Sequence, residues 1–231
     1  MSSFILKIIA VVAMLCDHIG LCLTGGIAST WNYIGRLAFP IFAYQISEGY
    51  CHTKDLKKYF TKLFVFAIIS QIPFNLFEYA LGFELHLNVL FTLLLGLASI
   101  TFFDKAPNKL LGICGVAICV ILGYFLKVDY SYFGVLVVFC FYLFKNNKWI
   151  TSLVFLLLVI AKYYTNLVAS GFYYQYIALA ISTFAAIIPI LLYNGKQGLK
   201  LKYFLYIFYP VHLAVLAIFY LLHHIFWSSF V

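Results

Sequence analysis

Long, uninterrupted apolar runs constrain this chain more than any other feature. Runs such as Phe4 to Leu23 and Tyr203 to Trp227 match the roughly 20 apolar residues that cross a bilayer as a helix. Backbone polar groups in hydrocarbon must pair within a helix or a closed barrel, and these runs lack the alternation of a barrel strand. The sequence therefore predicts an all-α, polytopic integral membrane protein.

The composition argues against a soluble domain and against a nucleic-acid-binding protein. Hydrophobic residues make up 65% of the 231 residues and charged residues 10%, against about 25% charged residues in soluble domains. The net charge of +8 comes from basic residues at segment ends, which indicates contact with lipid headgroups rather than with nucleic acid. The 6 cysteines are scattered without a C-x-x-C pair, so we interpret them as packing residues and predict no metal site.

The apolar segments predict about nine transmembrane helices. No internal repeat, low-complexity tract or linker divides the chain, so residues 1–231 are expected to form one domain. The predicted segments are Phe4 to Leu23, Tyr33 to Gly49, Tyr59 to Leu81, Leu87 to Phe103, Lys109 to Leu126, Ser131 to Phe144, Trp149 to Tyr164, Tyr173 to Tyr193 and Tyr203 to Trp227. The segments 131–144 and 149–164 are short for a complete span.

The distribution of basic residues favours one orientation. With the N-terminus in the cytoplasm, only Arg36, Lys127 and Lys162 of the 15 lysine and arginine residues fall away from the inner face. Lysine and arginine are enriched in cytoplasmic loops. We therefore predict a multi-pass protein of the plasma membrane with a cytoplasmic N-terminus and an outer C-terminus.

Three ionisable residues lie together in the outer half of the predicted bundle. Asp17 and His18 belong to the first segment and Arg36 to the second, and the short connection between these segments makes them antiparallel neighbours. A charged group at this depth costs on the order of 3 kcal/mol, so it needs a partner or a task. We predict an ion pair between Asp17 and Arg36.

His18 needs a partner from another helix, because adjacent residues on a helix point about 100° apart and Asp17 cannot orient its ring. The same outer half contains further polar residues, namely Gln71, Asn75, His86 and Asn88. These amides could bind a polar substrate, or they could join helices to one another.

A second polar group marks the inner end of the second segment. Glu48 and His52 are four residues apart and share a helix face, and Lys54, Lys57 and Lys58 follow. These lysines could anchor headgroups or receive the phosphates of a cytoplasmic cofactor. In the last segment, Tyr209 and a proline precede His212, where freed carbonyls and an imidazole could line a cavity or the helix could simply be kinked.

Several motifs, in matching order, resemble the TraX family over nearly the whole chain. They are Asp17-His18-Ile19-Gly20, the run from Gly35-Arg36-Leu37-Ala38-Phe39-Pro40 to Glu48-Gly49-Tyr50-Cys51-His52-Thr53-Lys54, Ser70-Gln71-Ile72-Pro73-Phe74-Asn75, Asn88-Val89-Leu90-Phe91-Thr92-Leu93 and Tyr209-Pro210-Val211-His212-Leu213. The resemblance is weak between about Gly112 and Lys196.

This resemblance implies an acetyltransferase, because the family's named member acetylates pilin subunits. The chain is also similar to transmembrane acyltransferases that take acetyl groups from cytoplasmic acetyl-CoA. On this basis His18, with Asp17, is expected to act as general base or acyl carrier. Substrate or acyl binding is expected at Arg36, Glu48, Gln71, Asn75, Asn88, Tyr209 and His212, and binding of acetyl-CoA at His52, Lys54, Lys57 and Lys58.

Two other functions remain open from the sequence. A transporter could use His18, Asp17 and Arg36 as a proton or substrate relay, although no inverted repeat is visible. A non-catalytic scaffold of a pilus or secretion apparatus would also fit. Membrane lipids are expected partners in every case, while the acceptor, whether peptide or glycan, and the oligomeric state stay open.

Overall fold

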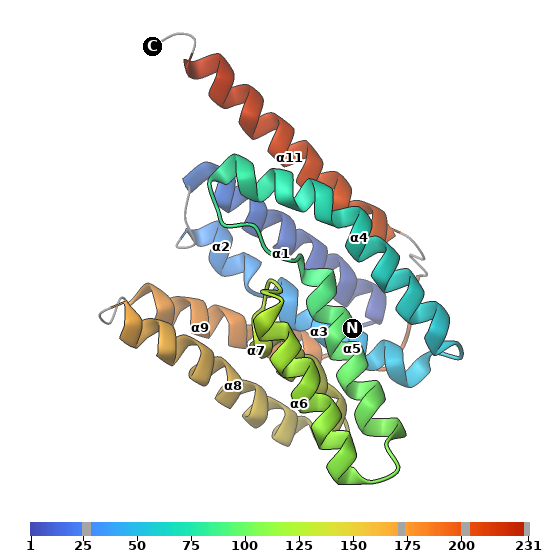
Figure 1. Cartoon of the computed structure of the whole chain (residues 1–231). Coiled ribbons are helices and arrows are strands. Elements are labelled where there is room, and N and C mark those ends of the chain that lie inside the picture. The colour runs from blue at the N-terminus through green and yellow to red at the C-terminus, as the bar shows by residue number, and fades with distance from the viewer. Residues whose placement is uncertain (25–28, 171–173, 200–203, 229–231) are drawn as a thin grey trace.

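The computed structural model describes residues 1–24, 29–170, 174–199 and 204–228. Within these residues the chain is all-helical apart from loops and one isolated bridge (Figure 1). The helices are α1 Ser3–Thr24, α2 Thr30–Gly35, α3 Ala38–His52, α4 Leu56–Leu81, α5 Val89–Lys105, α6 Lys109–Phe125, α7 Ser131–Leu143, α8 Lys148–Ala169, α9 Gln175–Ala185, α10 Ile187–Leu191 and α11 Phe204–Ser228. The predicted all-α class is confirmed.

Four of the described helices are long and apolar enough to cross a membrane: Ser3–Thr24, Leu56–Leu81, Lys148–Ala169 and Phe204–His223. Large apolar side chains cover their outer faces, for example Ile72 and Phe219, which are 77% and 68% exposed. Such a surface is unfavourable in water and suits lipid. The prediction of about nine crossings is not supported, since the other apolar helices are shorter. The cytoplasmic N-terminus stays a prediction.

Prolines break two of the predicted segments. Pro40 lacks an N–H and its ring clashes with the carbonyl four residues earlier, on Arg36, and there the predicted segment Tyr33 to Gly49 divides into α2 and α3. Pro189 acts in the same way on Ala185, where α9 ends and α10 follows. Each predicted single crossing is therefore two shorter helices.

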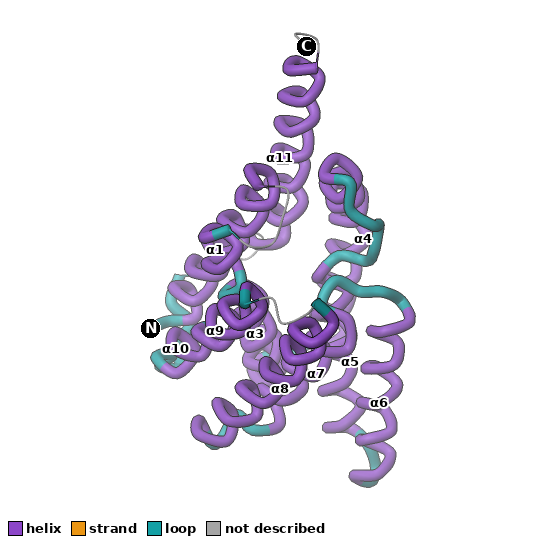
Figure 2. The backbone as a smooth tube through the Cα atoms, turned by 90° about the vertical axis from the view of Figure 1, so that its left-hand side faces the viewer, coloured by secondary structure: helices purple, strands orange, loops and turns teal. Residues whose placement is uncertain are grey.

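The helices that surround the polar residues come from distant parts of the chain. The last helix, α11, packs on α4 and also on α1, while α3 packs against α1 and α7. Figure 2 shows α11 extending beyond the rest of the bundle towards its C-terminal end. This arrangement places the first and the last helix of the chain side by side.

Two loops meet at the end of α4. Gly82, with φ of 74°, ends this helix in the left-handed conformation that glycine adopts without strain. The following loop pairs with the α6–α7 connection, because Leu87 accepts a hydrogen bond from Asp129 N at 2.8 Å and donates to Lys127 O at 3.1 Å. Lys127 has a φ of 48°, which is strained for a side chain larger than glycine. The pairing of these two loops brings Asp129 towards Asp17 and His18 of α1.

Close packing of α5 on α7 depends on Gly96. A Cβ atom at this position would lie 2.6 Å from Val138 Cβ and 2.7 Å from its Cγ1. Although alanine favours a helix over glycine by about 1 kcal/mol, overpacking costs about 1 to 3 kcal/mol. We expect Gly96→Ala to lower the melting temperature in detergent and Val138→Ala, added to it, to recover part of the loss. A Gly96→Ala protein as stable as the wild type would contradict this packing.

Candidate functional site

Two cavities lie inside the bundle. The first, the lysine cavity, has a volume of about 720 Å³ and is lined by residues that include Lys7, Gln45, Glu48, His52, Tyr59 and Lys62. The second, the histidine cavity, has a volume of about 390 Å³ and is lined by residues that include Asp17, His18, Arg36, Glu78, His86 and Asp129. Lys7 and His18 are both on α1 and lie about 16 Å apart along that helix, while Met14, between them, lines both cavities.

His18 is paired with a histidine of the last helix. His18 Nδ1 lies 2.8 Å from His212 Nε2, and the His212 Nδ1 lies 2.8 Å from the carbonyl oxygen of Phe208. The His18 ring also contacts the edge of Phe77, with ring centroids 5.3 Å apart. The expectation that His18 has a partner on another helix is confirmed, and that partner is His212 of α11.

This pairing determines the tautomer of His18. A carbonyl oxygen only accepts, so His212 must donate from Nδ1, and its Nε2 is then the acceptor in the neutral ring. His18 consequently donates from Nδ1 and keeps its own Nε2 unprotonated. An imidazole nitrogen with a free electron pair, on a residue that lines the histidine cavity, is the group required of a general base.

The predicted ion pair between Asp17 and Arg36 is confirmed. Arg36 Nη2 donates to Asp17 Oδ1 at 3.1 Å, and both side chains are 16% exposed. Asn32, which is fully buried, adds a hydrogen bond from Nδ2 to Asp17 Oδ1 at 3.2 Å. Gly35 permits this approach, because a Cβ atom there would lie 2.6 Å from Asp17 Cγ. The carboxylate is thus held away from His18 by α2 and by Arg36.

A second charged group lines the same cavity, and the sequence analysis named only one of its members, His86. His86 Nε2 lies 3.8 Å from Asp129 Oδ1 and its Nδ1 lies 3.9 Å from Glu78 Oε2. Asp129 raises the pKa of His86 to about 9, although burial opposes the shift. Acidic residues are scarce in this chain, with 7 in total. Inspection of each of them would have added Glu78 and Asp129 to the candidate residues.

Two aromatic side chains, Phe39 and Tyr130, line the histidine cavity, and Lys162 of α8 lies beside them. The Phe39 ring stacks on Tyr130 with centroids 3.8 Å apart, and Lys162 Nζ lies 4.6 Å from the Tyr130 ring and 4.5 Å from that of Phe133. Such cation–π contacts stabilise an ammonium group where water is scarce. No sequence motif marked Lys162 or Tyr130, because their meeting depends on the packing of α7 and α8.

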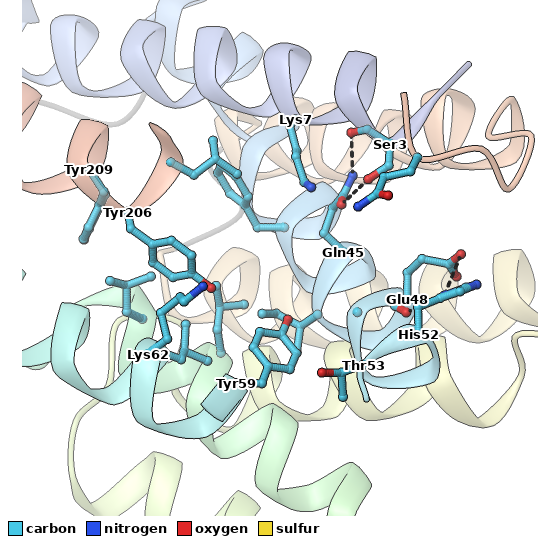
Figure 3. A pocket seen from close by; sticks show the side chains of 18 of the residues that line it. Ser3, Lys7, Gln45, Glu48, His52, Thr53, Tyr59, Lys62, Tyr206 and Tyr209 are labelled. Atoms are coloured by element: carbon cyan, nitrogen blue, oxygen red, sulfur yellow. Dashed lines mark hydrogen bonds and ion pairs between the residues drawn. The ribbon is translucent and has the colours of Figure 1, made fainter. Parts of the chain in front are cut away.

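The lysine cavity combines cations with hydrogen-bonding side chains. Figure 3 shows Lys7 of α1 and Lys62 of α4 on opposite sides of it, with Tyr206 of α11 close to Lys62. Lys62 Nζ lies 5.7 Å from the Tyr206 ring centroid. Glu48 accepts a hydrogen bond from Tyr193 at 3.1 Å. An anionic ligand with an apolar portion would find matching groups here.

The predicted cofactor residues are distributed over three places. His52 lines the lysine cavity, as does Glu48, whose Oε1 is 3.5 Å from His52 Nδ1. Lys57 and Lys58 line a shallower pocket that also reaches Lys62. Lys54 lies in a separate pocket between the ends of α3, α5 and α7, together with Lys105 and Lys145. Among the described residues, Lys7 and Lys62 are the lysines that the fold brings into the lysine cavity.

The predicted amides form a network between α4 and α5. Gln71 donates to Asn75 Oδ1 at 2.6 Å and accepts from Asn88 Nδ2 at 2.8 Å. Asn88 is fully buried, caps α5 and also donates to Ala67 O at 2.8 Å. In the described part of the chain none of these three amides lines either cavity. They satisfy one another and join two helices.

Tyr209, the remaining predicted residue, lines both cavities. It is 4% exposed and its phenol interacts with the backbone of Val89. The adjacent Pro210 leaves α11 continuous. Tyr209 therefore lies between the lysine cavity and the histidine pair.

Breaking the buried ion pair should be costly. Removal of one partner of such a pair typically costs about 3 to 5 kcal/mol, more than removal of both, because the remaining charge stays buried. We expect Asp17→Asn and Arg36→Gln each to lower the melting temperature in detergent more than the double variant does.

Lys127 is the matched control for these variants, because it lies 4.0 Å from Glu84 in a pair whose side chains are 75% and 94% exposed. Exposed pairs contribute about 0 to 1 kcal/mol, so Lys127→Gln should leave the melting temperature nearly unchanged. Single Asp17 and Arg36 variants as stable as this control would refute the stabilising role of the buried pair.

Two known proteins have sequences similar to this chain. It is 28% identical to a protein named "Probable fimbrial assembly protein FimC, serogroup H1" from Dichelobacter nodosus, across 94% of both chains. It is also 33% identical to an uncharacterized protein, RP591, of Rickettsia prowazekii (strain Madrid E), across 55% of this chain and 49% of the relative. No solved structure matches it significantly.

A family model described as "TraX protein" matches residues 2–220, which include every residue of both cavities named above. The match begins before Lys7 and ends beyond His212, so it contains the helices that build the two cavities. The chain belongs to the TraX protein family.

Proposed function

We propose that the protein is a membrane-embedded acetyltransferase that moves an acetyl group from acetyl-CoA to an amine or hydroxyl acceptor. One observation carries this proposal: the pairing of His18 with His212 leaves an unprotonated imidazole nitrogen on a residue that lines the histidine cavity, which adjoins the lysine cavity. Membership of the TraX family and similarity to a fimbrial assembly protein support it.

In the proposed reaction the acceptor attacks the thioester carbonyl while His18 Nε2 removes the proton from the attacking nitrogen or oxygen. The carbon–sulfur bond then breaks, and the coenzyme A thiolate leaves and takes the proton from the His18 imidazolium. His212 holds the ring in the required tautomer and accepts from its Nδ1–H throughout. In the covalent alternative His18 Nε2 attacks the thioester carbonyl and the carbon–sulfur bond breaks to release the coenzyme A thiolate. The acceptor then attacks the acetyl group, the bond from the acetyl carbon to His18 Nε2 breaks, and the proton of the acceptor passes to the thiolate.

Arg36 is suited to stabilise the negative charge that develops on the carbonyl oxygen. Its Nη2 is bound to Asp17, whereas its buried Nε has no hydrogen-bond partner among the described residues. The side chain lines the histidine cavity with His18. A preorganised donor in a site poor in water contributes several kcal/mol to a reaction of this kind.

The donor is proposed to bind in the lysine cavity. Lys7 and Lys62 would pair with the phosphates of acetyl-CoA, and the acyl end would point towards Tyr209. The lysine cavity and the pocket of Lys54, Lys105 and Lys145 both lie where α3 ends. This gathering of lysines supports a cytoplasmic placement of that end and, with it, of the N-terminus.

The acceptor is proposed to reach the histidine cavity from the opposite end. The relative's name points to fimbriae, so a pilin subunit is one candidate, and another peptide or a glycan would use the same chemistry. A non-catalytic role in pilus assembly is also compatible with that name. Hydrolysis or binding of acetyl-CoA by the detergent-solubilised protein separates these functions, because an assembly factor needs neither.

Replacement of His18 tests the base directly. His18→Gln retains polarity and similar size but removes the basic nitrogen, so acetyl transfer should fall by at least about a hundredfold while the melting temperature changes little. His223→Gln, on the exposed part of α11, is the control and should transfer normally. A folded His18→Gln protein with near-normal transfer would move the chemistry to another residue.

Charge removal tests the donor site. We expect Lys7→Gln and Lys62→Gln each to weaken acetyl-CoA binding about tenfold, as the loss of one charge-assisted hydrogen bond does. Binding is measured by isothermal titration of the protein in detergent. Lys54→Gln, Lys57→Gln and Lys58→Gln should have smaller effects, and Lys127→Gln none. A larger effect at Lys54 than at Lys62 would place the phosphates in the other pocket.

A further inference from the structure

Four side chains form the boundary between the two cavities. Met14 of α1, Phe42 of α3, Val89 of α5 and Tyr209 of α11 line both the lysine cavity and the histidine cavity. We call these four residues the apolar ring. Each of the four comes from a different helix, and together they mark where the two cavities adjoin.

The apolar ring lies directly beside the histidine pair. Met14 precedes His18 by four residues on α1, and Tyr209 precedes His212 by three residues on α11, spacings that place side chains on the same helix face. Met14 and Tyr209 are therefore about one helical turn from the two histidines, at roughly 6 Å and 4.5 Å along their helices. An acyl group that enters from the lysine cavity must pass these four side chains before its carbonyl reaches His18.

Burial and contacts restrict the opening of the ring. Met14 is 9% exposed and Tyr209 is 4% exposed, and the Tyr209 phenol interacts with the backbone of Val89 at the start of α5. Tyr209 therefore lies close to Val89, another member of the ring. Met14 has an unbranched, flexible side chain, so it is the member that can move aside most easily for a narrow group.

We propose that Met14, Phe42, Val89 and Tyr209 determine acyl selectivity by the width of the group that they let pass. The ring admits acetyl, and it rejects acyl groups that branch next to the carbonyl. This inference rests on the proposed acetyltransferase function and adds the residues that choose its donor.

Butyryl-CoA and isobutyryl-CoA carry acyl groups with the same number of carbon atoms, one straight and one branched. Comparing them tests the effect of acyl width separately from acyl size. The wild-type protein and the variants Val89→Ala and Met14→Ala are assayed with acetyl-, butyryl- and isobutyryl-CoA, and transfer to the acceptor amine is measured by mass spectrometry. We expect each variant to raise the ratio of isobutyryl to acetyl transfer at least about tenfold, since one methyl group in an apolar site is worth that factor or more. The ratio of butyryl to acetyl should rise less.

Leu97→Ala is the matched control. Leu97 is fully buried in α5 but lines neither cavity, so this variant loosens the core without touching the ring and should leave both ratios unchanged. If Met14→Ala does not fold, Val89→Ala removes only two methyl groups and carries the test. Val89→Ala widens the apolar ring, whereas Val89→Phe narrows it. Val89→Phe should therefore abolish acetyl transfer while acetyl-CoA binding is retained.

The outcomes separate this inference from the proposed function. Wild-type protein that transfers acetyl groups, with ring variants whose isobutyryl ratio equals that of Leu97→Ala, would overturn the apolar ring and leave the acetyltransferase intact. Wild-type protein that neither binds nor hydrolyses any of the three donors would overturn both. A raised isobutyryl ratio in the ring variants alone would establish the selectivity role.

Discussion

The ion pair between Asp17 and Arg36 joins α1 to the break between α2 and α3, and the remainder of the histidine cavity is arranged around it. Charges in an apolar bundle cannot be left unpaired without a large cost, so this contact sets the depth of α1 relative to α3. Asn32 and Gly35 complete it, the first by a hydrogen bond and the second by the absence of a side chain. With α1 in this position, His18 is directed towards α11.

The same requirement for partners explains how the other polar residues are used. Gln71, Asn75 and Asn88 satisfy one another between α4 and α5 and hold those helices together. His18 and His212 satisfy one another between α1 and α11, but their chain of hydrogen bonds ends at a carbonyl oxygen and therefore leaves one nitrogen unprotonated. A structural network and a reactive pair are thus built from the same kind of contact. In the amide network the side-chain oxygens all accept hydrogen bonds, whereas in the histidine pair His18 Nε2 stays available as an acceptor.

Some of this arrangement could be predicted from the sequence. The apolar runs predicted an all-α membrane protein, and the short connection between the first two segments predicted that Asp17 would meet Arg36. The sequence also predicted that His18 has a partner on another helix, and the structure identifies this partner as His212. The prediction of about nine crossings is not supported, because several of the predicted segments form helices too short to cross a membrane, and a proline such as Pro40 divides one apolar run into two helices.

The sequence by itself determined the solvent in which this chain folds, its helical class and the pairing of its most costly charges, because these follow from composition and from local spacing. Only the tertiary structure decided which lysines share a cavity, that Glu78, His86 and Asp129 meet, and that Met14, Phe42, Val89 and Tyr209 separate two cavities. These groups combine residues from helices far apart in the chain. Their assembly depends on how whole helix faces pack, and no single segment of sequence encodes that.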